Sequence, residues 1–428
     1  MARTRKALPA RVDVAHLISA GVLAAACPRP LIEAILAETG KASQRERRLP
    51  APAVVYYVMA LALWREAPLE EVLRVVCEGL QWLGGADQTE AVQVSKSAIS
   101  QARTRLGPDV MRHLAQRVLR PLAPAGAPGA WYRQRRVMAL DGSCLDVADE
   151  RANAKFFGYP TATRGQSAFP QARLLGLVEC GTHAIVAADI APYARSEKAM
   201  AAEALPGWLQ PDMLVLADRG FYSFKLWCLA ANSGAALVWR VSSTLKLSTQ
   251  QVLADGSYLS TVYDSADRAR RHGRTVRVIE YALQNSATAT EASYRLITTL
   301  LDAEQAPALE LAALYHERWE IEGVFDEFKT HLRGASTVLR SKTPDLVQQE
   351  LWGLLLAHFA IRQLMAQAAW RQALDPDRLS FMHAVRVIKR KLPQAAAVPP
   401  LSAWKNGATR CWPKSAAAAV TRAGSSAK

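Results

Sequence analysis

Residues 135–147 read RRVMALDGSCLDV, and this stretch decides how the middle of the chain folds. Its apolar run predicts a buried strand, and Asp141 comes directly after VMAL. Residues 173–192 then predict a hairpin that turns near Gly181 and Thr182. Further along the chain, the pattern predicts a helix over 196–209, a strand over 212–221, a helix over 223–234 and a strand over 235–241. The order of these elements therefore predicts an α/β fold.

Three strands, a helix, a strand, a helix and a strand form the order of a ribonuclease-H-like core. This match is a fold analogy, so function has to be argued from a site. Residues 242–293 interrupt the pattern with alternating polar and apolar residues and a basic cluster, RARRHGR. A strand resumes with YRLITTLLD at 294–302. We therefore expect a ribonuclease-H-like catalytic core with a β-rich insertion, preceded by an all-helical N-terminal domain.

The same reading divides the chain into six segments. They are a helical DNA-end-binding domain at 1–120, a Pro/Ala/Gly-rich linker at 121–134, the first part of the core at 135–241, the β-rich insertion at 242–293, the second part of the core at 294–372, and a basic tail at 373–428. A long apolar helix over 345–370 is expected to pack across the sheet.

One short helix of the N-terminal region could read DNA. Residues 94–106, VSKSAISQARTRL, predict a helix with Ser97 as its N-cap. Apolar residues at helical spacing are expected to point inward, and the polar residues Lys96, Ser100, Gln101, Arg103 and Arg105 outward. A small helix with short polar and basic side chains resembles the reader of a helix-turn-helix. An amphipathic helix with a solvated face is an equal alternative.

The composition points to a polyanionic partner. The chain has 428 residues, a net charge of +15 and an ordinary hydrophobic share of 50%. After Asp377 there is no acidic residue, while ten Lys or Arg follow. Nucleic acid is the commonest partner of a protein with such a positive electrostatic field. A basic C-terminal tail that only aids solubility is the plainer alternative.

The six cysteines include no CxxC pair, which argues against a zinc or disulfide framework. The N-terminus lacks a signal-peptide apolar core, and the apolar runs are short for a membrane span. We expect a cytoplasmic protein without membrane segments.

Two aspartates follow predicted strands and precede glycine-containing turns: Asp141 in LDGS and Asp218 in ADRGF. Acids just past buried strands lie at the rim of a sheet, where a site can form. Each also has a simpler explanation, as an Asp that opens a turn or caps a helix. Three further acids, Asp146, Asp149 and Asp189, are interpreted as structural or peripheral.

Residues 315–334, YHERWEIEGVFDEFKTHLRG, supply the third acid. On one regular helix, Tyr315, Arg318, Glu322 and Lys329 fall within an arc of about 60°. Glu322 and the two aspartates could hold two divalent cations through oxygen atoms, and Mg²⁺ suits carboxylates and phosphate oxygens. Arg318 and Lys329 would then donate to phosphate, and Tyr315 would offer its hydroxyl. Intrahelical ion pairs on a solvated face are the alternative.

The pattern Y-x2-R-x3-E-x6-K, together with LDGS and DRGF, resembles the DDE transposases of the "insertion sequence four" family. The resemblance covers nearly the whole chain. It implies that Asp141, Asp218 and Glu322 are the catalytic residues and the metal ligands, with two Mg²⁺ ions per site and Mn²⁺ as a substitute. It also implies that Tyr315, Arg318 and Lys329 bind the terminal phosphates of DNA.

The resemblance further implies a homodimer that binds element ends and target DNA in a bacterial, nucleoid-associated setting. Such enzymes carry out cut-and-paste transposition through a DNA hairpin. Related enzymes hold a flipped base on a tryptophan late in the insertion, whereas Tyr294 is the local aromatic residue here. A catalytically inactive or domesticated DNA-binding protein and a structure-specific nuclease remain alternative functions.

Overall fold

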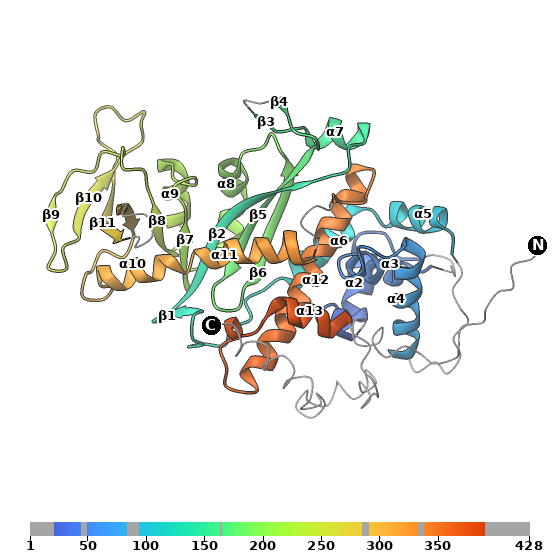
Figure 1. Ribbon diagram of the computed structural model, residues 1–428. Coiled ribbons are helices and arrows are strands. Elements are labelled where there is room, and N and C mark those ends of the chain that lie inside the picture. Colours follow the sequence, from blue (N-terminus) through green and yellow to red (C-terminus); the bar gives the residue numbers. More distant parts are fainter. Residues whose placement is uncertain are drawn as a thin grey trace, which may run out of the picture. The chain divides into compact units, whose positions relative to one another are not determined.

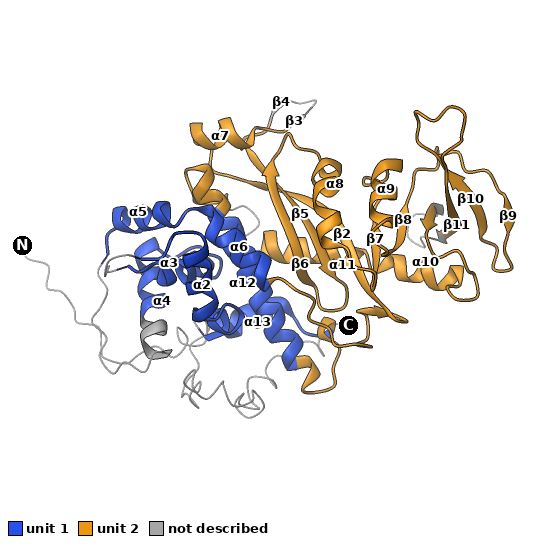
Figure 2. Cartoon of the chain, turned by 180° about the vertical axis from the view of Figure 1, so that it is seen from behind, with its two compact units in different colours: residues 1–118, 349–368, 378–428 blue, residues 119–348, 369–377 orange. Residues whose placement is uncertain are grey.

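The computed structural model describes residues 21–43, 49–83, 94–162, 165–284, 291–332 and 338–389. Contacts divide the chain into two compact units (Figure 2). Unit 1 comprises residues 1–118, 349–368 and 378–428, and unit 2 comprises residues 119–348 and 369–377. The basic tail expected at 373–428 lies mostly outside the described residues, which end at 389.

Unit 1 is helical in its described part. Its helices are α2 (Arg29–Glu38), α3 (Ala51–Ala60), α4 (Leu69–Leu83), α5 (Lys96–Leu106), α6 (Pro108–Val118), most of α12 (Pro344–Trp370) and α13 (Phe381–Lys389). The residues from Val54 to Ala60 of α3 are all buried. A Cβ on Gly353 of α12 would lie 2.7 Å from the carbonyl oxygen of Val58, so only glycine allows this close approach.

The predicted long helix is therefore present as α12, but its residues 349–368 group with the helices of unit 1. The sequence had placed this helix across the sheet, within a core that extended to residue 372. An apolar helix needs a partner surface, and hydropathy alone does not say which one. Within the described residues, no helix combines the length and the apolar character needed to cross a membrane.

The candidate DNA-reading helix α5 differs from its prediction in two ways. Ser95, rather than Ser97, is the N-cap, and its hydroxyl oxygen accepts from the Ala98 N–H at 3.3 Å. Arg103 is buried instead of outward-facing, because it lies on the same face as the apolar residues one turn away on either side. Its Nε donates to Gln349 Oε1 at 3.3 Å. The other expected polar residues are exposed: Lys96, Ser100, Gln101 and Arg105.

Unit 2 contains one long mixed sheet (Figure 1), with the strand order β6-β5-β2-β7-β8-β12-β11-β10-β9. Its strands are β1 (Trp131–Tyr132), β2 (Arg135–Asp146), β5 (Gln171–Glu179), β6 (Ala184–Pro192), β7 (Met213–Ala217), β8 (Ala236–Arg240), β9 (Gln251–Val252), β10 (Tyr258–Val262), β11 (Arg274–Gln284) and β12 (Glu291–Thr298). A separate ribbon pairs β3 (Thr161–Ala162) with β4 (Gly165–Gln166).

The first five strands in this order form a ribonuclease-H-like core. β6, β5 and β2 pair antiparallel, and β2, β7 and β8 pair parallel. The predicted hairpin, its turn after residue 180 and the two strands that follow are thus confirmed. The parallel pairs are joined by helices, as crossover connections require.

Two helices of unit 2 begin at a capping serine. The helices of this unit are α7 (Arg151–Phe157), α8 (Glu197–Trp208), α9 (Phe224–Ala231), α10 (Ala308–His316), α11 (Trp319–Asp326), the π-helix η1 (Glu327–Leu332) and the short 3₁₀ turn η2 (Pro376–Arg378). Ser196 caps α8 and Ser223 caps α9, each accepting a backbone N–H at 3.3 Å. The α8 and α9 side chains Met200 and Trp227 share a core with Leu140 and Val215 of the sheet.

The segment expected to link the two parts of the chain is anchored to the sheet. Glu179, at the end of β5, is fully buried. Its carboxylate accepts the N–H groups of Leu122 and Ala123 at 2.8 and 2.9 Å and the Thr182 hydroxyl at 2.6 Å, and it pairs with Arg136. A buried carboxylate with this many donors holds the linker against the edge of the core.

The insertion extends the main sheet. β12 pairs antiparallel with both β8 and β11, so β11, β10 and β9 continue the same layer. The expected boundary at residue 293 falls inside β12. The ribonuclease-H-like core and the insertion therefore share one continuous hydrogen-bonded layer.

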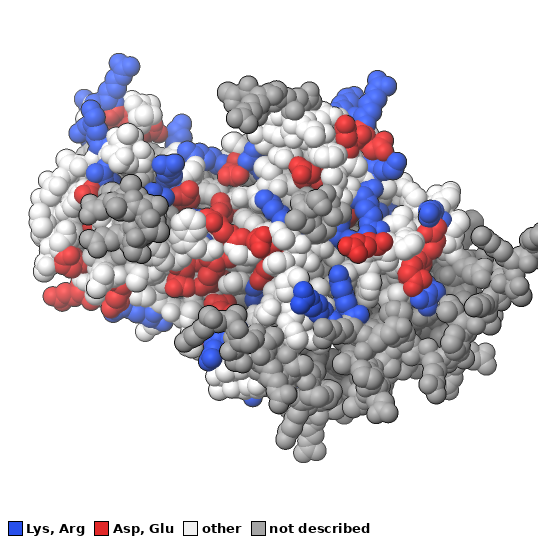
Figure 3. Space-filling view, viewed as in Figure 1, with Lys and Arg blue, Asp and Glu red and all other residues white. Residues whose placement is uncertain are grey.

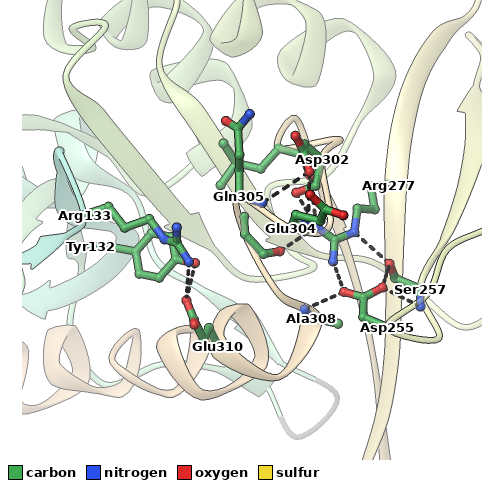
Figure 4. A network of polar contacts seen from close by, with 12 residues as sticks. Tyr132, Arg133, Asp255, Ser257, Arg277, Asp302, Glu304, Gln305, Ala308 and Glu310 are labelled. Carbon is green, nitrogen blue, oxygen red and sulfur yellow. Dashed lines mark hydrogen bonds and ion pairs between the residues drawn. The ribbon is translucent and has the colours of Figure 1, made fainter.

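A buried arginine joins the insertion to the start of α10 (Figure 4). Arg277 of β11 has no solvent exposure and pairs with Asp255. Its guanidinium donates to the Ser257 hydroxyl at 2.7 Å and to the Ala306 carbonyl at 2.6 Å. Asp255 in turn accepts the N–H of Ala308, the first residue of α10, at 2.8 Å. This network sets where α10 begins, and α10 leads directly to the candidate site.

Candidate active site

The register of the parallel strands brings two acids together. β2 and β7 pair up to Leu140 opposite Ala217. Asp141 and Asp218 are the next residue on each strand, so their Cα atoms continue this register. Asp218 directly follows β7 and opens a turn in which the Phe221 N–H donates to the Asp218 carbonyl at 3.0 Å.

Asp141 does not end a strand, contrary to the prediction, because β2 continues to Asp146 alongside β5. Gly142 is consequently a strand residue. A Cβ there would lie 2.4 Å from the carboxyl carbon of Glu197, at the start of α8. The glycine thus makes room for a fourth carboxylate instead of a turn.

Side-chain alternation points both acids to the same face of the sheet. Leu140 and Ala217 belong to the core shared with α8 and α9. Their neighbours Asp141 and Asp218 must therefore point to the opposite face. α11 lies over that face, because Phe325 comes within 3.5 Å of the position that a Cβ on Gly176 would take.

Helix α11 adds the third acid and a buried arginine. The Nη1 atom of Arg318 lies 3.6 Å from Asp141 Oδ2, and its Nη2 atom lies 3.3 Å from Glu322 Oε1. Burial alone lowers the pKa of Arg318, but Tyr315, Asp218, Asp141 and Glu322 together raise it above its usual range. Asp141 and Glu322 thus flank one guanidinium, and the charge of Asp218 also acts on it.

The stretch 315–334 is not one regular helix. α10 ends at His316, Glu317 and Arg318 form a turn, and α11 is followed by the π-helix η1. The Arg318 N–H reaches back to the Tyr315 carbonyl at 3.2 Å, which tightens the chain at this point. The expected common arc of about 60° presumed an uninterrupted α-helix, so it does not describe these four side chains.

Tyr315 lies beneath the site. Its side chain is buried, and its hydroxyl donates to the carbonyl of Ala217 at 3.4 Å, one residue before Asp218. Burial raises the pKa of Tyr315 well above its usual range. A contact between this hydroxyl and DNA would require the bond to Ala217 to open.

Lys329 lies on η1, close enough to Cys144 of β2 for its charge to act on that thiol. Burial raises the pKa of the Cys144 thiol, and the positive charges of Arg173 and Lys329 oppose that rise. Glu322 is the most accessible of the three acids, with 49% of its side chain exposed, against 22% for Asp141.

Burial also weakens the acidity of Asp141. It raises the pKa of this carboxyl to about 6, although the N–H of Gly142, at 2.8 Å, and Arg318 act in the opposite direction. Glu197 and Asp218 raise it further by like-charge repulsion.

The three acids are of the chemical kind that binds a divalent cation, although among the described residues they do not bring one ligand atom each within 4.8 Å of one another. The donors are carboxylate oxygens, which hard cations prefer. Asp218 Oδ1 is buried and accepts no hydrogen bond from the described residues. A buried oxygen without a donor is costly unless a cation or another partner satisfies it.

Two residues of the site had not been predicted. Arg240 ends β8, one register step beyond the pair of Ala217 with Trp239. Its Nη1 atom lies 4.0 Å from Asp218 Oδ1, and its guanidinium lies 4.3 Å from the centre of the Tyr294 ring. Glu197 was missed because it comes from a helix start. The basic residue after a buried strand in VWRV was the available signal for Arg240.

The other acids considered from the sequence have local partners. Asp146 Oδ1 accepts from Gln171 at 2.8 Å, and Asp149 Oδ1 accepts from the Tyr159 hydroxyl. Asp189 Oδ1 accepts the N–H of Ile190 at 2.9 Å.

Tyr294, the aromatic residue considered for a flipped base, stacks on Tyr281 with ring centres 5.2 Å apart.

Charge is unevenly distributed around the site (Figure 3). Acidic side chains gather over α10 and α11, whereas basic side chains gather on the loop between β10 and β11. Arg268, Arg270 and Arg271 of that loop are exposed. An acidic centre would repel DNA unless cations offset its charge.

Two family models match this chain. A family model for the insertion element 4 transposase N-terminal region matches residues 17–116, and one for the transposase DDE domain matches residues 132–360. Transposase InsG for insertion sequence element IS4 of Escherichia coli K12 is 28% identical over 373 residues, which cover 85% of this chain and 80% of that protein.

Putative transposase InsZ of the same strain is 24% identical over 235 residues, which cover 55% of this chain and 75% of that protein. A piggyBac transposase synaptic complex with hairpin DNA superposes with a TM-score of 0.44 and 11% identity, over 93% of this chain and 91% of that chain. A DDE domain depends on divalent metal ions. Since the DDE model matches more than half of the chain, the protein belongs to the DDE transposases of the insertion element 4 family, enzymes that cleave DNA and transfer its strands.

Proposed function

We propose that this transposase cuts and joins DNA at a site formed by Asp141, Asp218 and Glu322, with Mg²⁺ as its natural ion and Mn²⁺ as a substitute. The observation that carries the proposal is the adjacency of Asp141 and Asp218 in the β2–β7 register, beneath an arginine that also reaches Glu322. When bound, two such ions would activate the attacking oxygen and stabilise the leaving oxygen of an in-line displacement.

The remaining residues have distinct roles in this proposal. Arg318 holds Asp141 and Glu322 on one side of the sheet, because its two terminal nitrogens lie near both carboxylates. Tyr315 supports the β7 end through Ala217, and its hydroxyl becomes a phosphate donor if that bond opens. Lys329, half-buried on η1, would donate to a terminal phosphate of the DNA.

DNA binding would extend beyond the catalytic centre. The exposed arginines of the β10–β11 loop would contact the phosphate backbone, and the exposed face of α5 would contribute to recognition of the element ends. We propose that two chains act together on paired ends, that cleavage passes through a DNA hairpin, and that the protein works at the bacterial nucleoid in the cytoplasm.

The test is cleavage of a labelled duplex that carries the element end and its flank, with Mg²⁺, Mn²⁺ or EDTA, resolved on a denaturing gel. We expect metal-dependent nicking followed by a hairpin-sized product. Asp141→Asn, Asp218→Asn and Glu322→Gln should each reduce the cleavage rate by more than about 100-fold, because each removes a charged ligand. Binding of the end DNA, measured by gel shift, should change little.

Asp149→Asn is the matched control, since this acid pairs with Tyr159 away from the three ligands. A wild-type cleavage rate in any of the three ligand variants would contradict the proposed site. If the wild-type chain binds the end DNA but does not cleave it with either metal ion, the result would favour a DNA-binding protein that has lost catalysis. Sedimentation with and without end DNA would test the dimer.

A further inference from the structure

A second group of possible metal ligands lies in unit 2, apart from the three catalytic acids. His183 is on the turn between β5 and β6, Glu320 is on α11, and Asp377 is on η2. One potential ligand atom from each of these residues lies within 4.8 Å of the others. Three segments that are distant in the sequence thus converge on one point.

The distances match those of a coordinated ion. His183 Nε2 lies 3.5 Å from Glu320 Oε2 and 3.2 Å from Asp377 Oδ1. Two ligand atoms of a tetrahedral ion with bonds of about 2.0–2.1 Å lie about 3.4 Å apart. The imidazole and the two carboxylates could therefore receive an ion with only small side-chain movements.

Several carboxyl groups crowd around the imidazole. Glu327 Oε1 lies 3.8 Å from His183 Nδ1, so a third carboxylate faces the same ring. The side chains of His183, Glu320 and Glu327 are only 16%, 14% and 11% exposed. A cation held among these partly buried carboxyl groups would offset the repulsion between them.

The backbone of the turn holds the imidazole in this place. His183 has a φ of 57°, in the left-handed region that few residues other than glycine adopt. The neighbouring Gly181 also has a positive φ, and its N–H donates to Glu320 Oε2 at 2.6 Å. The turn therefore presents a ring nitrogen toward Asp377 and orders the Glu320 carboxylate of α11 beside it.

We propose that His183, Glu320 and Asp377 bind one divalent transition-metal ion of the Zn²⁺ class. Mixed imidazole and carboxylate ligands favour Zn²⁺ over Mg²⁺, which prefers oxygen alone. Glu320 lies between Arg318 and Glu322 on the chain, so the ion would fasten α11 to the β5–β6 turn. It is a structural ion that positions α11, and its existence does not depend on the proposed catalytic roles.

The test measures Zn²⁺ bound to the full chain by equilibrium dialysis. The background carries Asp141→Asn, Asp218→Asn and Glu322→Gln, so that the catalytic acids no longer compete for the metal. We expect about one Zn²⁺ per chain in this background. His183→Asn, which tolerates the left-handed backbone, and Asp377→Asn should each weaken binding by at least about tenfold.

His331→Asn is the matched control. His331 also lies near a carboxylate, Asp326 at 3.5 Å, but this is its one described ion pair. Zn²⁺ binding should survive this change. Co²⁺ serves as a second probe, because its visible spectrum distinguishes nitrogen and oxygen ligands from thiolate.

Three results would overturn the proposal. They are an absence of bound Zn²⁺ in the background chain, unchanged binding in both His183→Asn and Asp377→Asn, and a thiolate band in the Co²⁺ spectrum. Circular dichroism checks that each variant folds, and if one of the two unfolds, the other decides. Because the dialysis needs no DNA and no catalysis, its outcome is separate from that of the cleavage test.

Discussion

Replacing Arg277 with methionine should destabilise unit 2 strongly. Methionine fills a similar length but removes the charge and all the donors. The guanidinium has no solvent exposure, and it bonds Ser257 at 2.7 Å, the Ala306 carbonyl at 2.6 Å and the Asp302 carbonyl at 3.3 Å. Removing one partner of a buried ion pair costs about 3–5 kcal/mol.

The lower end of that range applies here, because Asp255 remains 21% exposed and keeps the Ala308 N–H. We therefore expect a loss of about 3 kcal/mol in the free energy of unfolding. In a domain of this size, each kcal/mol lowers Tm by about 2–4 °C, so the expected drop is about 6–12 °C. Differential scanning calorimetry of the full chain would measure it.

Two comparisons make the result decisive. Arg268→Met, an exposed change in the same insertion, should leave Tm within about 2 °C of the wild type. Adding Asp255→Asn to Arg277→Met should recover part of the loss, because it removes the carboxylate left without its partner. Two results would refute this reasoning. One is a Tm for Arg277→Met that lies as close to the wild type as that of Arg268→Met. The other is a loss of stability in the double variant that equals the sum of the losses in the two single variants.

Three further outcomes are expected. Gly181→Ala should lower the unfolding free energy by about 2 kcal/mol or more in urea titrations, because φ is +77° and a Cβ would lie 2.7 Å from the Ala130 nitrogen; stability equal to wild type would contradict the close approach. Lys329→Ala should weaken end-DNA binding and reduce the salt slope by about one phosphate contact; an unchanged slope would assign Lys329 to an internal ion pair. Burial acts to raise the pKa of Asp255, but the hydrogen bonds that its carboxylate accepts outweigh burial and lower the pKa below the usual 3.8. The charged carboxylate therefore stabilises the fold above pH 3.8, and this stabilisation is lost as the pH falls through the lowered pKa. Asp255→Asn should flatten acid unfolding curves in this range, and unchanged curves would refute that assignment.

The two aspartates were visible in the sequence, but their adjacency was not. Apolar strands followed by acids identify Asp141 and Asp218, since hydropathy and turn residues are local signals. Their pairing depends on the register between strand positions that are 77 residues apart, which local patterns do not encode. Arg240 was missed for the same reason.

The prediction of one regular helix from Tyr315 onward was wrong for a different reason. Its spacing placed Tyr315 and Lys329 on one arc, but the chain turns at Glu317 and Arg318 and then widens into a π-helix. Tertiary contacts decide these irregularities, and they place Tyr315 beneath the site. Arg103 shows a similar limit, because a buried arginine needs a partner such as Gln349 that lies far away in the sequence.

The parallel register of β2 and β7 also determines which changes in chain length the enzyme can tolerate. The connection between β2 and β5 and the loop between β10 and β11 could gain or lose residues without moving Asp141 or Asp218. A single residue inserted before Asp141 within β2 would turn its carboxylate toward Met200 and Trp227, and a leucine would face α11 instead. Length variation among active relatives should therefore spare the strand segments 136–141 and 213–218 and accumulate in the connections.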